Sequence, residues 1–407
     1  MNLIIFSHPT FFPSQSIPRF TKILAEGMRM RGHYVEIWQP KPIFFYLPLP
    51  IKIKKWLGYV DQYIIFPVAV RRRLKKYSSD TLFVFADHAL GAWVPLVANR
   101  PYIIHCHDFL AQHAAKNKFL ENIVSWTGRQ YQYYIHRGYS KGKYFLSVSN
   151  KTQKDLHTFL PTKPLYSEVI YNGLSPCFKS LEPCGARALF GTRVNLNLAD
   201  GYLLHVGGNQ WYKNRSGVID IYNAWRSDSS SDLPLILIGE SPDKNLLLKH
   251  AKSPFKNNIY FLPGMKDEVV NLAYAGASVF LFPSLAEGFG WPIVEAMASG
   301  CPVITTNEPP MTEVSGSAAF LIPRQPSEQS KIKEWTAIAV KVINELLQYS
   351  PQKRKAIIES GFCNANRFTS KIALDKTEAA YKHILQLAGK EKADNNLKPE
   401  VQNTVYC

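Results

Sequence analysis

The fold is decided by one stretch of sequence, Phe282-Pro-Ser-Leu-Ala-Glu-Gly-Phe-Gly-Trp-Pro-Ile-Val-Glu-Ala-Met-Ala-Ser-Gly300. An apolar run enters this stretch and stops at a proline, which predicts a buried strand that runs into a loop. Pro292 suits the first turn of a helix, and the glycine at position 300 suits the end of that helix. Two glutamates therefore take defined places: Glu287 lies on the loop, and Glu295 lies about one turn into the helix.

The loop between this strand and this helix predicts a ligand site. Ligands of open α/β sheets bind at the carboxyl edge of the strands, and a helix N-terminus offers free N–H groups to a phosphate. Gly288 and Gly290 allow tight turns and a close approach of the backbone to a ligand. A nucleotide sugar has both the hydroxyls and the phosphates that two carboxylates and a helix start would bind. The alternative is an ordinary strand, loop and helix with two solvated acids, but the glycines, the proline and the strand that follows favour the ligand site.

The composition is that of a globular protein with two domains. The chain has 407 residues, of which 46% are hydrophobic and 19% charged, enough for two cores of ordinary size. The first residues lack a positive n-region, and no apolar run approaches the ~20 residues that span a bilayer. We therefore expect a cytoplasmic protein, or one attached to the cytosolic face of a membrane. The cysteines are scattered without metal-ligand spacing, which indicates a reducing compartment and no disulfide framework: 106, 177, 184, 301, 363 and 407.

Positive charge is concentrated in the first part of the chain. The net charge is +17, and residues 1–150 hold 20 Lys and Arg against 7 Asp and Glu, a net charge of +13. Within residues 44–76, aromatic and aliphatic side chains alternate with basic ones, a composition typical of surfaces that lie on anionic lipid. Two alternatives are a solvated basic face over core aromatics and a nucleic-acid surface; no nucleic-acid motif supports the second, and we expect no nucleic-acid partner. The predicted membrane surface comprises Lys52, Lys54, Lys55, Trp56, Arg71, Arg72 and Arg73.

The alternation of strands and helices predicts two doubly wound domains joined by a linker. The first domain comprises residues 1–173, the linker residues 174–187 and the second domain residues 188–371. A final helix at about 372–388 follows, and residues 389–407 are polar, lack periodicity and are expected to be disordered. The main predicted strands are 3–6, 33–38, 82–86, 102–105, 144–149, 202–206, 235–238, 259–261, 279–282 and 302–306, with helices at about 19–31 and 119–140.

Taken together, these motifs resemble a known family. The segment from Glu287 to Glu295 resembles the E-x7-E signature of retaining glycosyltransferases of group 1, the GT4 class, which have the GT-B fold. Four other segments fall in that family's order: 169–173, 202–208 followed by Lys213-Asn214, 235–240 and 261–268. The resemblance covers residues 145–325 well and the first 110 residues loosely. It implies two Rossmann-like domains that face a central cleft, with the final helix packed back on the first domain.

The resemblance places the donor, a nucleotide diphosphate sugar, on the second domain. It implies that Glu295 binds the ribose hydroxyls, that Glu287 faces the sugar, and that Lys213 meets the diphosphate as charge grows on the leaving nucleotide. The family often has an Arg five residues before this Lys; that position is Gly208 here, and Arg215 is a candidate replacement. The predicted donor-binding residues are Gly207, Gly208, Lys213, Lys266, Glu287, Gly288, Phe289, Gly290, Trp291 and Glu295.

The acceptor side is predicted on the first domain. His107 and Asp108 follow the strand at 102–105, and the resemblance places that histidine at the cleft near the reacting sugar, where it positions a hydroxyl. A histidine at a strand end is more often structural, and this alternative stays open. Ser14 and Gln15 occupy the loop where the family usually has a pair of glycines. The predicted catalytic residues are Glu287, His107 and Lys213.

The predicted reaction is transfer of a hexose to a lipid-linked or otherwise membrane-associated glycan, with the anomeric configuration retained. We favour a front-face route, in which the leaving phosphate takes the acceptor's proton; a double displacement would need Glu287 as the nucleophile. The sequence has no D-x-D motif in a suitable loop and no His/Cys cluster, so we expect no cofactor and no essential metal. Two alternatives stay open: a soluble transferase with a small-molecule acceptor, and a non-catalytic protein that binds nucleotide sugars or partners.

Overall fold

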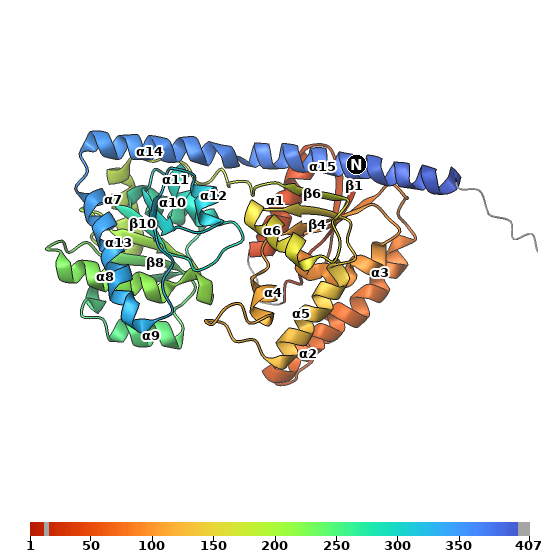
Figure 1. Ribbon diagram of the computed structural model, residues 1–407, viewed down its shortest axis with the longest axis horizontal. Helices are drawn as coiled ribbons and strands as arrows, with labels where there is room; N and C mark the ends of the chain where they lie inside the picture. The colour runs from red at the N-terminus through yellow and green to blue at the C-terminus, as the bar shows by residue number, and fades with distance from the viewer. Residues whose placement is uncertain (12–15, 398–407) are drawn as a thin grey trace, which may run out of the picture.

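The computed structural model describes residues 1–11 and 16–397. Figure 1 shows two lobes, each a parallel β-sheet covered by helices. The first sheet has the strand order β2-β1-β3-β4-β5-β6, and the second has the order β12-β11-β10-β7-β8-β9. In each sheet the chain first moves to one side of its starting strand and then continues on the other side, which makes both sheets doubly wound. The prediction of an α/β protein with two Rossmann-like domains is confirmed.

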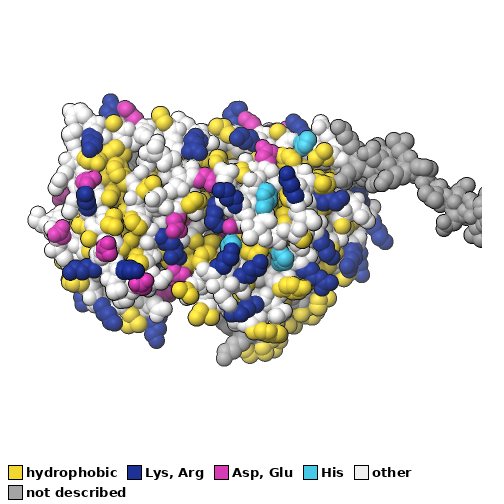
Figure 2. Space-filling view, viewed as in Figure 1, with side chains coloured by type: hydrophobic (Ala, Val, Ile, Leu, Met, Phe, Trp, Pro, Cys, Tyr) yellow, Lys and Arg dark blue, Asp and Glu magenta, His cyan; other side chains and the backbone are white. Residues whose placement is uncertain are grey.

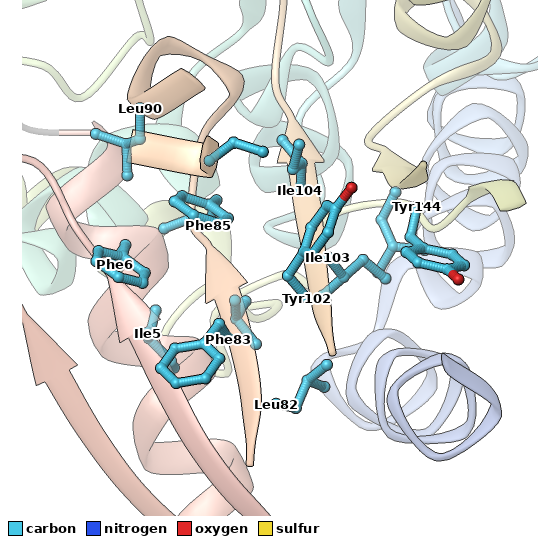
Figure 3. Packing of buried hydrophobic residues seen from close by; sticks show 14 of the residues in the cluster. Ile5, Phe6, Leu82, Phe83, Phe85, Leu90, Tyr102, Ile103, Ile104 and Tyr144 are labelled. Atoms are coloured by element: carbon cyan, nitrogen blue, oxygen red, sulfur yellow. The ribbon is translucent and has the colours of Figure 1, made fainter. Parts of the chain in front are cut away.

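The strands at the centre of the first sheet are apolar on both faces, because helices cover both sides of a parallel sheet. Figure 3 shows Ile5 and Phe6 of β1 near Phe85 of β3 and Ile104 of β4, all fully buried. The rings of Phe6 and Phe85 stack with their centroids 4.7 Å apart. The elements are β1 (Asn2–Phe6), α1 (Ser16–Met30), β2 (Tyr34–Trp38), α2 (Ile51–Val60), α3 (Phe66–Leu74), β3 (Leu82–Phe85), β4 (Tyr102–Cys106), α4 (Leu110–Ala115), α5 (Trp126–Tyr139), β5 (Tyr144–Ser147), α6 (Asn150–Phe159) and β6 (Tyr166–Val169).

The second sheet has its reversal of strand order between two central, buried strands, β7 and β10. Phe280 of β10 lies opposite Leu204 of β7 on one side and opposite Val303 of β11 on the other. The elements are α7 (Pro183–Val194), β7 (Leu203–Val206), α8 (Arg215–Asp228), β8 (Leu235–Gly239), α9 (Lys244–Ala251), β9 (Ile259–Pro263), α10 (Asp267–Gly276), β10 (Val279–Phe282), α11 (Trp291–Ala298), β11 (Val303–Thr306), α12 (Met311–Ser315), β12 (Phe320–Ile322), α13 (Ile332–Leu347) and α14 (Pro351–Ala365).

The last helix, α15 (Ser370–Leu397), packs on the first domain, as the resemblance implies. Figure 1 shows α14 and α15 end to end along one side of the molecule, α14 over the second lobe and α15 over the first. Tyr381 of α15 meets the buried His105 of β4, with 2.7 Å between its hydroxyl and Nε2. Where the chain passes between the lobes, Leu174 N donates to Phe368 O at 2.6 Å.

Most predicted boundaries agree with the structure to within about three residues, and three differ by more or change the domain limits. Helix α15 continues to Leu397, so the disorder predicted from residue 389 is wrong as far as 397, and residues 398–407 lie outside the described chain. Helix α7 begins inside the predicted linker, because Glu182 accepts hydrogen bonds from the first free N–H groups of that helix. The helix predicted at 119–140 begins only at Trp126, where Ser125 Oγ accepts a hydrogen bond from Gly128 N at 3.2 Å.

Candidate functional site

The site lies at the switch point of the second sheet, between the neighbouring strands β7 and β10. The loops that leave two such strands diverge to opposite sides, which opens a crevice at the carboxyl edge of the sheet. The loop after β7 leads to Lys213, and the loop after β10 carries Glu287. Lys213 Nζ lies 2.8 Å from Glu287 Oε1 and 3.0 Å from Oε2. The fold thus joins two predicted residues that are far apart in the sequence.

Neighbouring groups hold this ion pair in place. Ser284 Oγ donates to Glu287 Oε1 at 2.9 Å, and Glu287 is buried. The turn that contains Lys213 ends at Asn214, which has a left-handed backbone with φ of 55°. Asn214 Nδ2 donates to Pro283 O at 3.0 Å and so ties the two loops together. Because a buried carboxylate is costly unless it is paired, each member of the Lys213–Glu287 pair fixes the other.

Glu295 lies one turn into α11. Gly290, with a φ of 102°, precedes this helix, and Pro292 is in its first turn, as the sequence predicts. Burial raises the pKa of the Glu295 carboxyl to about 7, although Arg19 of the first domain acts against this shift. Tyr274 OH lies 3.3 Å from Glu295 Oε2. When ionised, a carboxyl in this position accepts hydrogen bonds from a diol, the predicted role toward ribose.

The other predicted donor residues on the loop after β10 divide into backbone and side-chain roles. Gly288 faces the first domain so closely that a Cβ on it would lie 1.8 Å from His107 O. The Phe289 ring packs in the second-domain core, 5.5 Å from the ring of Phe368, so its backbone N–H alone is left for the predicted role. Trp291 is half-buried in the wall of an apolar cavity between α1 and α15.

The remaining predicted donor residues lie on two neighbouring loops. Gly207 and Gly208 follow β7, and a Cβ on Gly208 would lie 2.5 Å from Gln210 Oε1 and 2.9 Å from Glu240 Oε1. Gln210 and Glu240 therefore fill the space where a longer side chain at position 208 would begin. Lys266 is exposed at the start of α10.

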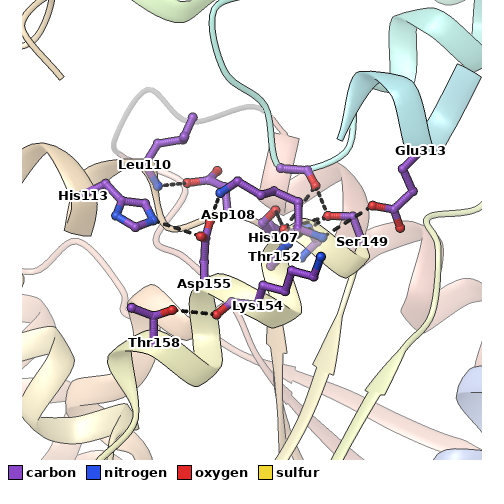
Figure 4. A network of polar contacts seen from close by, with 12 residues as sticks. His107, Asp108, Leu110, His113, Ser149, Thr152, Lys154, Asp155, Thr158 and Glu313 are labelled. Atoms are coloured by element: carbon purple, nitrogen blue, oxygen red, sulfur yellow. Dashed lines mark hydrogen bonds and ion pairs between the residues drawn. The ribbon is translucent and has the colours of Figure 1, made fainter. Parts of the chain in front are cut away.

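On the first domain, His107 and Asp108 follow β4 and lie against the second domain. Figure 4 shows these two residues beside the start of α6, where Ser149 Oγ donates to Gly288 O at 2.7 Å. Thr152 Oγ1, one turn into the same helix, lies 3.2 Å from His107 O. Hydrogen bonds between the domains therefore fix His107 near the loop that carries Glu287.

The His107 ring is prepared to accept a hydrogen bond. Its Nε2 lies 3.0 Å from Ala86 O, and because a carbonyl only accepts, the ring proton is on Nε2. Burial lowers the pKa of His107, which keeps the ring neutral near pH 7 and leaves Nδ1 as an acceptor. Asp108 Oδ1 accepts a hydrogen bond from Leu110 N at 2.9 Å, and burial raises the pKa of this carboxyl. This environment suits a residue that positions a hydroxyl.

A second pair lies at the switch point of the first sheet, between β1 and β3. His8 Nε2 is 3.1 Å from Asp87 Oδ2, and His88 Nδ1 is 2.9 Å from Asp87 Oδ1. Burial acts to raise the pKa of Asp87, but His88 and His8 together hold it well below its usual range. The sequence shows Asp87-His88 as polar residues after a strand, whereas nothing in it singles out His8.

Arg19 is a further site residue that sequence analysis missed. Its Nη2 donates to Asp267 Oδ2 of the second domain at 2.8 Å, and its guanidinium lies 6.0 Å from the centroid of the Trp291 ring. The two members of this ion pair are 248 residues apart, so no local pattern signals their contact. The predicted acceptor residues Ser14 and Gln15 lie outside the described residues.

Comparisons with known proteins agree with this architecture. The family model described as Glycosyltransferase Family 4 matches residues 17–176, and the one described as Glycosyl transferases group 1 matches residues 192–361. The O-antigen chain mannosyltransferase B of Escherichia coli is 30% identical over 184 residues, 45% of this chain and 46% of that protein, so the match spans about half of the relative. The lipopolysaccharide glucosyltransferase WaaG of Escherichia coli K12 is 23% identical over 315 residues, 75% of this chain and 80% of that protein.

Two solved structures share the fold over nearly their whole length. HepE from Anabaena, in complex with UDP and glucose, superposes with a TM-score of 0.69 at 18% identity, covering 94% of this chain and 100% of HepE. WaaG, a glycosyltransferase involved in lipopolysaccharide biosynthesis, gives a TM-score of 0.68 at 18% identity, covering 93% of this chain and 98% of WaaG. With one family model matched in each domain and this fold, the chain belongs to the group 1, GT4-type family of glycosyltransferases with the GT-B fold.

Proposed function

We propose that this protein is a retaining glycosyltransferase that moves a hexose from a nucleotide diphosphate sugar to a glycan acceptor held at a membrane. The observation that carries the proposal is the Lys213–Glu287 pair at the switch point of the second sheet, with Glu295 one turn into the adjoining helix. These groups match the three parts of such a donor: a cation for the diphosphate, a carboxylate for the sugar and a carboxyl for the ribose diol.

The transfer proceeds on one face of the sugar. The diphosphate lies at the N-terminus of α11 and beside Lys213, where N–H groups and the ammonium stabilise the charge that grows as the bond from C1 to the phosphate oxygen breaks. The acceptor oxygen forms its bond to C1 on that same face and gives its proton to the leaving phosphate. Glu287 faces the positive charge that develops on the ring, and His107 Nδ1 accepts a hydrogen bond from a hydroxyl. We propose no essential metal for this step; unchanged transfer in EDTA is the expected result.

The donor test is a thermal-shift panel of UDP, GDP, ADP and dTDP. A nucleotide that binds only the folded protein at 100 times its Kd adds about 2.7 kcal/mol to the free energy of unfolding. We expect a shift from one nucleotide and its loss in Glu295→Ala. A product analysis with the matching nucleotide sugar then reads the anomeric configuration, and an inverted product would overturn the retaining mechanism. Nucleotide binding without transfer to any acceptor would favour the non-catalytic alternative.

An exposed apolar and basic surface on the first domain supports a membrane acceptor. The side chains of Trp56 and Ile64 are 59% exposed, and Ile123 is 87% exposed. Figure 2 shows hydrophobic side chains gathered where Figure 1 places α2 and α5, with Lys and Arg side chains beside them along α3. Within the described residues, no helix is long and apolar enough to cross a bilayer. Apolar side chains next to cations suit a surface that lies on anionic lipid.

The predicted membrane residues contribute unequally to this surface. Lys55, Arg71 and Arg72 are exposed, together with Trp56. Lys54 is half-buried over the Phe45 ring at 5.9 Å. The Arg73 guanidinium lies 5.0 Å from the centroid of the Trp38 ring, so part of this side chain is used in packing. The side chain of Lys52 is outside the described part of the chain.

Vesicle sedimentation tests the membrane part of the proposal. We expect binding to vesicles that contain an anionic phospholipid, weaker binding at high salt, and none to zwitterionic vesicles. Each Lys or Arg at the surface contributes about 1 kcal/mol, so Arg71→Ala with Arg72→Ala should weaken binding roughly 30-fold. Lys252→Ala, an exposed change on the second domain, is the control. Absence of binding at low ionic strength would favour the alternative of a soluble transferase with a small-molecule acceptor.

A further inference from the structure

Arg215 is a buried cation under the loop that follows β7. It is the first residue of α8, two positions after Lys213, and it is only 4% exposed. Its Nη1 donates to Asn209 Oδ1 at 2.5 Å and to Glu240 O at 2.9 Å. The guanidinium lies over the Phe261 ring, 5.4 Å from the ring centroid. These contacts place a positive charge at the base of the diphosphate subsite of the proposed function.

The charge of Arg215 has no counter-charge in contact with it. Its Nε and Nη2 are buried and meet no hydrogen-bond acceptor in the described part of the chain, and no ion pair joins it to a described carboxylate. Burial lowers the pKa of Arg215, while Glu240 and Asp243 act to raise it, and a guanidinium stays charged near neutral pH. A buried charge without a contacting counter-charge is costly, and an anion held above the loop would offset part of that cost through space.

The other groups at this loop leave a diphosphate short of positive charge. Lys213 is paired with both oxygens of Glu287. His205, at the end of β7, is neutral because burial lowers its pKa to about 3. Gly208 has no side chain, and Gln210 closes the space beside it. Arg215 is therefore the described cation at this loop that no described carboxylate contacts.

We propose that Arg215 is a positioning residue for the donor, which supplies positive charge to the diphosphate from beneath the loop 207–210. This inference rests on the proposed function and deepens it. Arg215 acts without touching the phosphates, because its hydrogen bonds to Asn209 and Glu240 hold the loop that faces them. Salt screens a buried charge only weakly, so the positive charge of Arg215 also stabilises the negative charge that grows on the leaving nucleotide. The charge that position 208 lacks is thus provided from the start of α8.

The test compares the affinity for a nucleoside diphosphate with the affinity for the corresponding nucleoside. The diphosphate is the one among UDP, GDP, ADP and dTDP that binds the wild-type protein. Arg215→Met keeps an unbranched apolar side chain beside Phe261 but removes the charge and both hydrogen bonds of the guanidinium. We expect at least a tenfold loss of affinity for the diphosphate and less than a twofold change for the nucleoside. A purely structural role predicts equal losses for both ligands, and that result would overturn the proposal.

Two further variants keep the test decisive. Arg215→Lys restores the charge and should recover most of the diphosphate affinity; failure to do so would also overturn the proposal. Arg226→Met is the matched control, because Arg226 lies on the same helix over the Phe255 ring at 5.0 Å, with Nε buried and unpartnered among the described residues. If the wild-type protein binds no nucleotide, the proposed function fails. If the wild-type protein binds a nucleotide but Arg215→Met keeps the wild-type ratio of diphosphate affinity to nucleoside affinity, only this inference fails.

Discussion

At the switch point of the second sheet the loops after β7 and β10 bring Lys213 to Glu287, and at that of the first sheet the loops after β1 and β3 bring His8 to Asp87. The second-domain pair consists of a lysine and a carboxylate, and another cation, Arg215, lies beside it. We call these three residues, together with Glu295, the donor wall. The first-domain residues that follow β1, β3 and β4, which we call the acceptor wall, include several histidines. The one that meets the second domain, His107, has a pKa lowered by burial and is neutral near pH 7. Permanent charge suits a diphosphate, whereas neutral acceptors suit hydroxyls. The comparison therefore supports the proposal that the donor binds at the second domain and the acceptor at the first.

The largest effect should come from removing Lys213, the cation of the donor wall that pairs with Glu287. We expect Lys213→Ala to lower kcat about 10³-fold, because it removes charge stabilisation from the leaving diphosphate. Glu287→Gln should cost a similar factor, and the double variant little more than either single one, since the two side chains act as a unit. Initial rates with saturating donor measure this, with Lys252→Ala as the control. Losses that simply multiply in the double variant would show that the pair does not act as one.

The second effect tests whether the two walls must meet. Gly288→Ala would place a Cβ 1.8 Å from His107 O, so the domains could not keep their present contact. We expect kcat to fall about 100-fold, the cost of displacing reacting groups by about 1 Å, with a smaller loss of nucleotide affinity because Lys213 and Glu295 keep their places. Gly361→Ala is the control, since its Cβ would lie 3.6 Å from Met297. An equal loss of nucleotide affinity would mean that the substitution disturbs the donor wall itself.

The donor wall could be predicted from the sequence far better than the acceptor wall. Glu287 and Glu295 lie in one strand–loop–helix unit, where a proline and glycines fix the turn and the helix start. By contrast, His8 meets Asp87 across 79 residues and Arg19 meets Asp267 across 248, and such contacts depend on strand order and domain packing. Sequence periodicity carries no information on either. The same limit explains Arg215, whose missing partners become visible only when its surroundings are known.

A smaller effect should come from the acceptor wall. We expect His107→Ala to lower kcat/KM for the acceptor 10- to 100-fold, because a lost buried hydrogen bond costs about 1–3 kcal/mol. Affinity for the nucleotide should stay within twofold, and the pH profile between 7 and 8 should not change, since burial lowers the pKa of His107 below its ordinary value of 6.5. His136→Ala is the control, because that ring bonds to Phe159 O within the first domain. Loss of nucleotide affinity would place His107 on the donor side and break the comparison.

The smallest effect is a pH dependence that belongs to the donor wall alone. The pKa of Glu295 in the folded protein is about 7, above its ordinary value of 4.5, so the folded state favours the protonated carboxyl. The stability from this group is complete below pH 4.5 and is lost as the pH rises through 7, on the order of 3 kcal/mol in all. Ribose hydroxyls donate to the ionised form, so nucleoside affinity should rise about tenfold from pH 6 to 8 as that form becomes populated. Calorimetric titration at the two pH values measures this.

Glu295→Gln sharpens this last prediction, because it copies the protonated carboxyl at every pH. Its Tm should fall less than that of the wild-type protein between pH 5 and 8, and its nucleoside affinity should be low and nearly independent of pH. Glu268→Gln, an exposed change on α10 at the same edge of the sheet, should keep the wild-type behaviour. If the pH dependence survives in Glu295→Gln, the titrating group is a different one. Asp108, a carboxyl of the opposite wall whose pKa is also raised by burial, would then be the first to substitute.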